Sequence, residues 1–154
     1  MKKNEEAMTL KGGWSVEYNY AIGPTGRKFF TALKDEAKII APKCPKCNLV
    51  MLPPRSFCER CFVPADEWVE VGKEGTIQAF TIVPYFFESL PDPPYATAMV
   101  MLDGANTAIA NFVKNVDLSN LKEAAKKLAI GKRVKVVFEK KREGTINDFH
   151  YELV

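Results

Sequence analysis

The sequence predicts a mainly β protein in which a helical segment and a small cysteine-bearing ribbon precede a five-stranded barrel. All four cysteines lie between residues 44 and 61 as two C-x-x-C pairs. Beyond residue 71, short runs alternate apolar and polar residues, and a helical stripe interrupts them. At 154 residues and 47% hydrophobic content, the chain can form a packed core without crosslinks. We expect segments at residues 1–37, 38–70 and 71–154.

The N-terminal segment contains a predicted helix in "GPTGRKFFTALKDEAKII". Pro24 and Thr25 suit its start, and one face carries Phe29, Phe30, Leu33 and Ala37. The aromatic residues could simply pack on the following ribbon. Because a small ribbon offers little core to cover, we instead expect the helix to expose Phe29, Phe30 and Leu33 as a docking surface.

The ribbon is the stretch "CPKCNLVMLPPRSFCERC". Each C-x-x-C turn places two sulfurs close together, and two such turns form a closed tetrahedral site. The polar, charged N-terminus shows no signal peptide or membrane span, so we expect the cytoplasm, where disulfides are rare. A thioredoxin-type redox site would need a βαβ context, and an iron centre is a further alternative. The pattern favours a structural Zn2+ bound by Cys44, Cys47, Cys58 and Cys61, with Asn48 suited to a positive φ.

The barrel is predicted from five strands and one helix. "GTIQAFTIV" is the first strand, and "YATAMVMLDGANTAIANFV" is a hairpin that turns at Asp103-Gly104. The helix "NLKEAAKKLAIG" has Asn120 as its N-cap and Gly131 as its stop. "KRVKVVFEK" and "TINDFHYELV" complete the set. Five strands with a helix between the third and the fourth are the order of an OB-fold barrel.

The loop between the first two strands, "PYFFESLPDPPY" at residues 84–95, is rich in proline and aromatic residues. Its prolines stiffen the backbone and should hold Tyr85, Phe86 and Phe87 in a fixed geometry. The loop could lie back over the barrel. Alternatively, it forms a wall of an apolar ligand channel or a partner interface, which is the functional interpretation.

Charge and composition limit the function further. Residues 122–143 hold nine Lys or Arg and three Glu, in a chain of net charge +3. Single-strand binders interleave aromatic residues with a basic groove, whereas here the two are separate in sequence. The single histidine, His150, is expected to be an exposed or hydrogen-bonded strand residue without a catalytic role. With the cysteines assigned to metal, no nucleophile with a paired base is recognisable, so independent catalysis is not expected.

The order of these parts resembles the DUF35 family of rubredoxin-like zinc ribbon plus OB-fold proteins. The resemblance covers residues 14–154, and "PPRSFCERC", "GKEGTIQAFTIV" and "IGKRVKVVFEK" carry it. It implies a non-catalytic accessory subunit of a thiolase-type acyltransferase, in a hetero-oligomer that helps to bind an acyl-CoA. Benzoylsuccinyl-CoA thiolase is one example of such a partner. It also matches the four cysteines to the family's zinc ligands.

Within that role, the coenzyme A thioester or the partner enzyme would be contacted by aromatic and basic side chains. The candidates are Arg27, Lys28, Phe29, Phe30, Arg55, Arg60, Tyr85, Phe86 and Phe87. The alternative function is that of an OB-fold protein binding single-stranded nucleic acid. Co-purification distinguishes them, because one predicts a thiolase-like protein and the other nucleic acid with a steep salt dependence.

Overall fold

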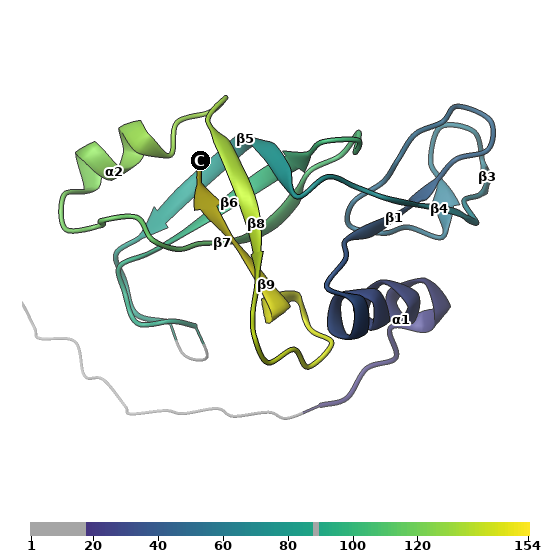
Figure 1. The fold of residues 1–154 in the computed structure, drawn as a ribbon, viewed down its shortest axis with the longest axis horizontal. Coiled ribbons are helices and arrows are strands. Elements are labelled where there is room, and N and C mark those ends of the chain that lie inside the picture. The colour runs from purple at the N-terminus through teal and green to yellow at the C-terminus, as the bar shows by residue number, and fades with distance from the viewer. Residues whose placement is uncertain (1–17, 88–89) are drawn as a thin grey trace, which may run out of the picture.

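A computed structural model describes residues 18–87 and 90–154 (Figure 1). Its largest part is a closed barrel with the strand order β5-β6-β7-β9-β8. The five strands are β5 (Glu74–Val83), β6 (Tyr95–Leu102), β7 (Ile109–Val113), β8 (Arg133–Phe138) and β9 (Phe149–Leu153). Helix α2 (Leu121–Lys127) lies between β7 and β8, and the short helix η2 (Ile146–Asp148) precedes β9. The predicted five-stranded barrel, with a helix after the third strand, is confirmed.

The barrel closes unevenly around its circumference. The β5–β6, β6–β7, β5–β8 and β8–β9 pairs are antiparallel ladders of several residues. By contrast, β7 and β9 are parallel and pair only through Val113 and Tyr151. Strands β7 and β9 therefore form a short seam, where the barrel has its shortest backbone pairing.

Helix α2 follows the sequence prediction at its start and differs at its end. The Asn120 side chain caps the helix by accepting hydrogen bonds from the N–H groups of Lys122 and Glu123. The helix ends at Lys127, earlier than predicted, and Gly131 lies in the following turn with φ +89°. Among the described residues, no helix combines the length and the apolar content needed to cross a bilayer.

The ribbon is built from two small antiparallel pairs. Strand β1 (Ile40–Lys43) pairs with β4 (Glu67–Glu70), and β2 (Phe57–Cys58) pairs with β3 (Val63–Pro64). An isolated bridge between Lys43 and Val50 brings the first knuckle back to β1. These pairs hold the two cysteine turns opposite each other. Two short strand pairs are therefore enough to bring the four cysteines together.

The N-terminal segment is helical only from residue 23 onward. Helix α1 (Gly23–Thr31) continues into a π-helical turn, η1 (Ala32–Glu36), and Ala37 ends it in the left-handed region at φ 52°. Residues 18–22 form no helix, and residues 1–17 of the predicted N-terminal segment lie outside the described residues.

The prediction that this helix exposes its apolar face is wrong for two of its three residues. Phe29 is 2% exposed and Leu33 is fully buried, while Phe30 is partly buried against the same core. The reason is that the helix, the ribbon and the barrel share one hydrophobic cluster, in which Phe29 and Leu33 join Ile39 and Leu52. The helix face is thus core of the protein, in line with the alternative that its aromatic residues pack against the rest of the chain.

Direct hydrogen bonds join the ribbon to the barrel. The β6–β7 connection supplies Asn106, whose side chain accepts from Val50 N–H at 2.8 Å. It also supplies Thr107, whose hydroxyl contacts both the N–H and the carbonyl of Leu52 at 2.7 and 2.6 Å. On the other side, Arg142 donates from the β8–β9 connection to the carbonyl of Lys34. The contacts of Asn106 and Thr107 fix the ribbon relative to the barrel, and that of Arg142 fixes the end of the N-terminal helical segment.

Candidate metal centre and contact surfaces

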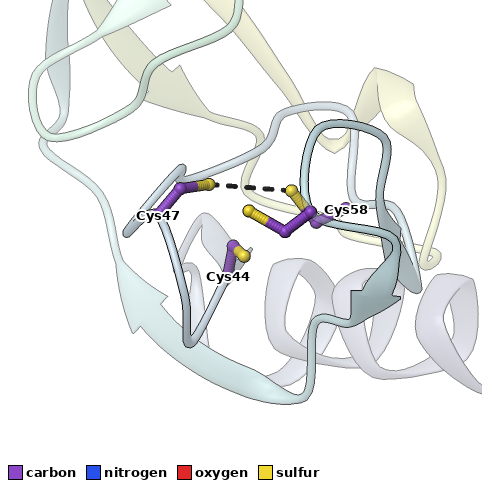
Figure 2. Close-up of side chains that lie close together, drawn as sticks. Cys44, Cys47 and Cys58 are labelled. Carbon is purple, nitrogen blue, oxygen red and sulfur yellow. Dashed lines mark hydrogen bonds between the residues drawn. The ribbon is translucent and has the colours of Figure 1, made fainter.

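The four cysteines converge at the tip of the ribbon. Their sulfur atoms all lie within 4.8 Å of one another, and Cys47 Sγ and Cys58 Sγ are 3.7 Å apart. Figure 2 shows the sulfurs of Cys44, Cys47 and Cys58 pointing into the space between the two turns. A tetrahedral zinc ion with Zn–S bonds of about 2.3 Å requires sulfurs about 3.8 Å apart. The donor set and its spacing therefore fit a structural Zn2+.

The two turns have matching backbone geometry. Asn48 N–H donates to Cys44 O at 3.0 Å, and Phe62 N–H donates to Cys58 O at 2.9 Å. Both closing residues have positive φ, 60° at Asn48 and 53° at Phe62. The predicted positive φ at Asn48 is confirmed, and Phe62 adopts the same conformation although side chains disfavour it. Each turn thus forms a knuckle that presents its two sulfurs to one ion.

The electrostatics of the sulfurs match a site that needs a cation. Backbone N–H groups of Cys47 and Lys46 stabilise a thiolate at Cys44, lowering the pKa of that thiol to about 7 against the effect of burial. At Cys61, the hydrogen bond with Cys47, burial and the neighbouring sulfurs raise the pKa to about 12. Deprotonation of one thiol to a thiolate therefore disfavours deprotonation of its neighbours. A divalent cation removes that conflict by pairing with all four thiolates.

Around the centre, the ribbon has a small core of its own. Cys44, Leu49, Met51, Cys58 and Ala65 form a separate buried cluster. Outside it, Phe57 and Phe62 make an edge-to-face pair with ring centroids 6.1 Å apart, and both rings are exposed. A cluster this small contributes little burial, so we expect a bound metal to stabilise the tip of the ribbon.

Comparison with known families assigns both parts of the chain. Residues 31–67 match the model described as "ChsH2, rubredoxin-like zinc ribbon domain". Residues 68–139 match the model described as "ChsH2, C-terminal OB-fold domain". The chain belongs to the ChsH2 (DUF35) family. This confirms the resemblance found in the sequence, and with it the four-cysteine ribbon followed by an OB fold.

Solved structures with this fold agree with the family assignment. A chain from "Ltp2-ChsH2(DUF35) aldolase" superposes with a TM-score of 0.66 at 18% identity, covering 88% of this chain and 98% of the other. A DUF35 protein of unknown function from Sulfolobus solfataricus gives a TM-score of 0.64 at 25% identity, covering 86% of this chain and 87% of the other. Comparison with curated protein sequences gives no match.

The predicted basic contact residues of this DUF35 chain lie around α1 and the ribbon. Lys28 stacks over the Trp68 ring of β4, with its Nζ 4.7 Å from the ring centroid. Arg27 and Lys28 line a hollow of about 330 Å³ along α1. On the ribbon, Arg55 forms an ion pair with Glu59, and Arg60 is exposed. Phe29 is buried beneath this surface, so its ring does not reach the solvent.

The predicted aromatic contact residues lie elsewhere. Tyr85, Phe86 and Phe87 are 72%, 68% and 52% exposed, and they follow directly on the end of β5. In Figure 1 this connection is at the lower left, whereas α1 and the ribbon are at the right. Residues 88–89 of the same loop lie outside the described residues. The structure therefore separates the predicted contact set into two surfaces, one on the β5–β6 connection and one around α1 and the ribbon.

One polar cluster was missed by the sequence analysis. His150 is 8% exposed, and its Nδ1 lies 2.9 Å from Glu139 Oε1, which also contacts Lys114 Nζ at 2.6 Å. The Lys114 hydrogen bond is the main reason why the pKa of Glu139 lies below its usual range. The predicted hydrogen-bonded His150 is confirmed, although it is buried. The cluster joins three separate segments, so only strand pairing could have revealed it.

Proposed function

We propose that this DUF35 protein is a non-catalytic, zinc-stabilised accessory subunit of an enzyme that acts on an acyl-CoA. The partner would be a thiolase-like enzyme, as the family resemblance implies. The observation that carries the proposal is the exposure of Tyr85, Phe86 and Phe87 on a proline-rich loop. Three adjacent aromatic rings turned to the solvent contribute little to the stability of the chain, and aromatic residues are the commonest anchors of protein interfaces.

The chemistry of the chain supports an accessory role. Within residues 18–87 and 90–154, the only histidine is His150, which is engaged with Glu139, and the cysteines gather at the metal centre. A closed site of four thiolates leaves no open position for a substrate. In the aldolase structure with the same fold, a ChsH2 (DUF35) chain is named together with Ltp2. This pairing in a relative supports assembly with an enzyme here.

The outward face of the barrel does not favour nucleic acid. In OB folds, the second and third strands and the loops beside them usually form the ligand face. Here the outward residues of β6 and β7 are Thr97, Met99, Met101, Ala110 and Phe112. None of them is basic, whereas a nucleic-acid groove needs cations close to its aromatic residues.

A binding experiment with a matched control tests the proposal. The recombinant chain is mixed with a thiolase-like acyl-CoA enzyme from the same organism, and the dissociation constant is measured by calorimetry. Loss of two anchor rings should cost about 2 kcal/mol or more, so Phe86→Ala with Phe87→Ala should weaken binding roughly thirtyfold. Ile130→Ala, which removes an exposed apolar residue between α2 and β8, should leave binding unchanged. Equal affinity for all three proteins would contradict the proposal.

A further inference from the structure

The strongest unassigned feature is a cavity at the seam between β7 and β9. It has a volume of about 410 Å³, within the range of small-ligand sites. Its wall is mainly apolar and includes the rings of Tyr95, Phe112 and Phe149 together with Val113. Phe149 and Val113 belong to the hydrophobic core, whereas Phe112 faces outward, so the cavity lies at the barrel wall, between the core and the surface.

The barrel topology explains why a cavity exists at this place. Strands β7 and β9 pair only through Val113 and Tyr151, and beyond that pair the Asn111 side chain joins β7 to the carbonyls of Ile146 and Phe149 at 2.9 Å. The start of β6, the end of β7 and the start of β9 meet there, since Tyr95 precedes Ala96 opposite Val113. Leu90 and Pro91 from the β5–β6 loop and Asn147 from the β8–β9 connection complete the rim. These two loops and the adjacent strands are where OB folds generally bind their ligands.

The side chains that line the cavity favour a ligand with a planar aromatic ring. Tyr95 and Phe112 meet edge to face, with centroids 5.8 Å apart, and Phe149 forms a similar pair with Tyr151. Aromatic edges and faces arranged in this way form favourable contacts with another ring at 4.5–7 Å centroid separations. A cavity lined by three rings and by aliphatic side chains therefore fits a single aromatic ring better than a flexible polar chain.

The polar edge of the cavity sets the charge of the ligand. Lys114 and His150 line the cavity, and both contact Glu139. Behind them, Glu152 contacts Lys135 at 3.4 Å and lies 3.6 Å from His150 Nε2. The negative charges of the two carboxylates in this cluster are offset by the positive charges of the two lysines. An ionised ligand would break that balance in a partly desolvated site, whereas a neutral hydroxyl or amide can share its hydrogen bonds.

We propose that the cavity between β7 and β9 binds a neutral aromatic compound of one ring that carries a single hydroxyl or amide group. The ring lies against Tyr95, Phe112 and Phe149, and the polar group faces the edge formed by Lys114 and His150. This site is independent of the proposed accessory function, because a lone chain contains every residue of it.

A charge series of one ring system tests the site. Benzyl alcohol, benzoate and benzylamine are titrated into the zinc-loaded, 15N-labelled chain, and amide chemical shifts are followed. Benzyl alcohol should shift the amides of Ala96, Val113, Phe149 and His150 saturably. It should bind roughly tenfold more tightly than either ion, because each ion must be desolvated beside a balanced cluster. Benzoate or benzylamine binding equally or more tightly would overturn the neutral ligand class.

Two variants and a control connect the shifts to this cavity. Phe112→Ala removes a wall ring, and Asn147→Trp places a ring across the rim from an exposed position. Each should weaken benzyl alcohol binding at least fivefold. Met99→Ala, at a residue that is 47% exposed on the outer face of β6 and away from the cavity, should not change binding. If Phe112→Ala fails to fold, Asn147→Trp decides alone. Unsaturable shifts, or shifts that persist in Asn147→Trp, would overturn the site.

Discussion

The β8–β9 connection is organised around one buried carboxylate, that of Asp148, and its removal gives a sharp stability test. Asp148 is 3% exposed and accepts from the N–H of Glu143 at 3.0 Å, from the N–H of Gly144 at 2.7 Å and from the Thr145 hydroxyl at 3.3 Å. This connection also carries Arg142, which reaches the carbonyl of Lys34 beside α1. We expect Asp148→Asn to destabilise the β8–β9 connection.

The magnitude follows from the hydrogen bonds. A hydrogen bond to a charged group contributes about 1.5–3 kcal/mol net. The asparagine amide keeps one acceptor oxygen but turns an NH2 group toward a backbone donor, so at least one such bond is lost. We expect Asp148→Asn to lower the free energy of unfolding by about 2–3 kcal/mol at pH 7, which corresponds to about 5–10 °C in Tm for a chain of this size. Urea denaturation of the zinc-loaded protein measures it.

The pH dependence gives an independent check. Burial would raise the pKa of Asp148, but the hydrogen bonds from Glu143, Gly144 and Thr145 outweigh it and hold the pKa below its usual range. A carboxylate of this kind stabilises the fold fully above its unfolded pKa, about 3.9. The stabilisation is lost as the pH falls through the lower folded value. The difference between wild type and Asp148→Asn should therefore shrink in strong acid.

The matched control is Asp117→Asn. Asp117 is exposed and accepts one backbone hydrogen bond, from Ser119 at 2.9 Å. Its substitution should change the free energy of unfolding by about 0.5 kcal/mol or less. Comparing proteins at the same pH cancels the loss of metal affinity in acid. A loss of stability at Asp148 no larger than that at Asp117, or a difference that grows as the pH falls, would contradict this role of Asp148.

Three further predictions concern the metal, the barrel and the histidine. Elemental analysis should find one Zn2+ per chain, and chelation should unfold the ribbon; iron in its place would contradict the assignment. Gly75→Ala should destabilise the barrel by about 2 kcal/mol or more in urea denaturation, because a Cβ there would lie 2.6 Å from Met101 O; a neutral effect would show that β6 can move. His150→Ala should leave the rate of the reconstituted enzyme complex nearly unchanged, and a large loss of rate in a folded variant would show a catalytic contribution.

The metal ligands and the barrel order could be predicted because local rules determine them. A C-x-x-C turn fixes the separation of its two sulfurs within a few bonds, so Cys44 and Cys47 form half a site wherever the ribbon lies. The five strands and α2 each carry a periodic pattern, and Asn120 marks a helix start through its own side chain. Such features depend little on distant contacts.

What could not be predicted depends on contacts between distant segments. The periodicity of Phe29 and Leu33 identifies an apolar face but not its partner, and that partner comes from Ile39, Leu52 and the barrel. Arg27 and Phe86 were grouped by chemistry, yet one belongs to α1 and the other to the β5–β6 connection, which lie apart in the fold (Figure 1). Lys114, Glu139 and His150 meet only because the barrel closes, and no local pattern in the sequence records that closure.

The most direct test of the accessory role is to measure acyl-CoA turnover by three samples: the zinc-loaded chain alone, its thiolase-like partner alone, and the two together. We predict no turnover by the chain alone and a higher rate for the complex than for the partner. The same mixture, run on a sizing column, should elute as one hetero-oligomer that contains no nucleic acid. Turnover by the isolated chain would contradict the account. Failure to bind the enzyme, together with binding of single-stranded nucleic acid that depends steeply on salt, would contradict it as well.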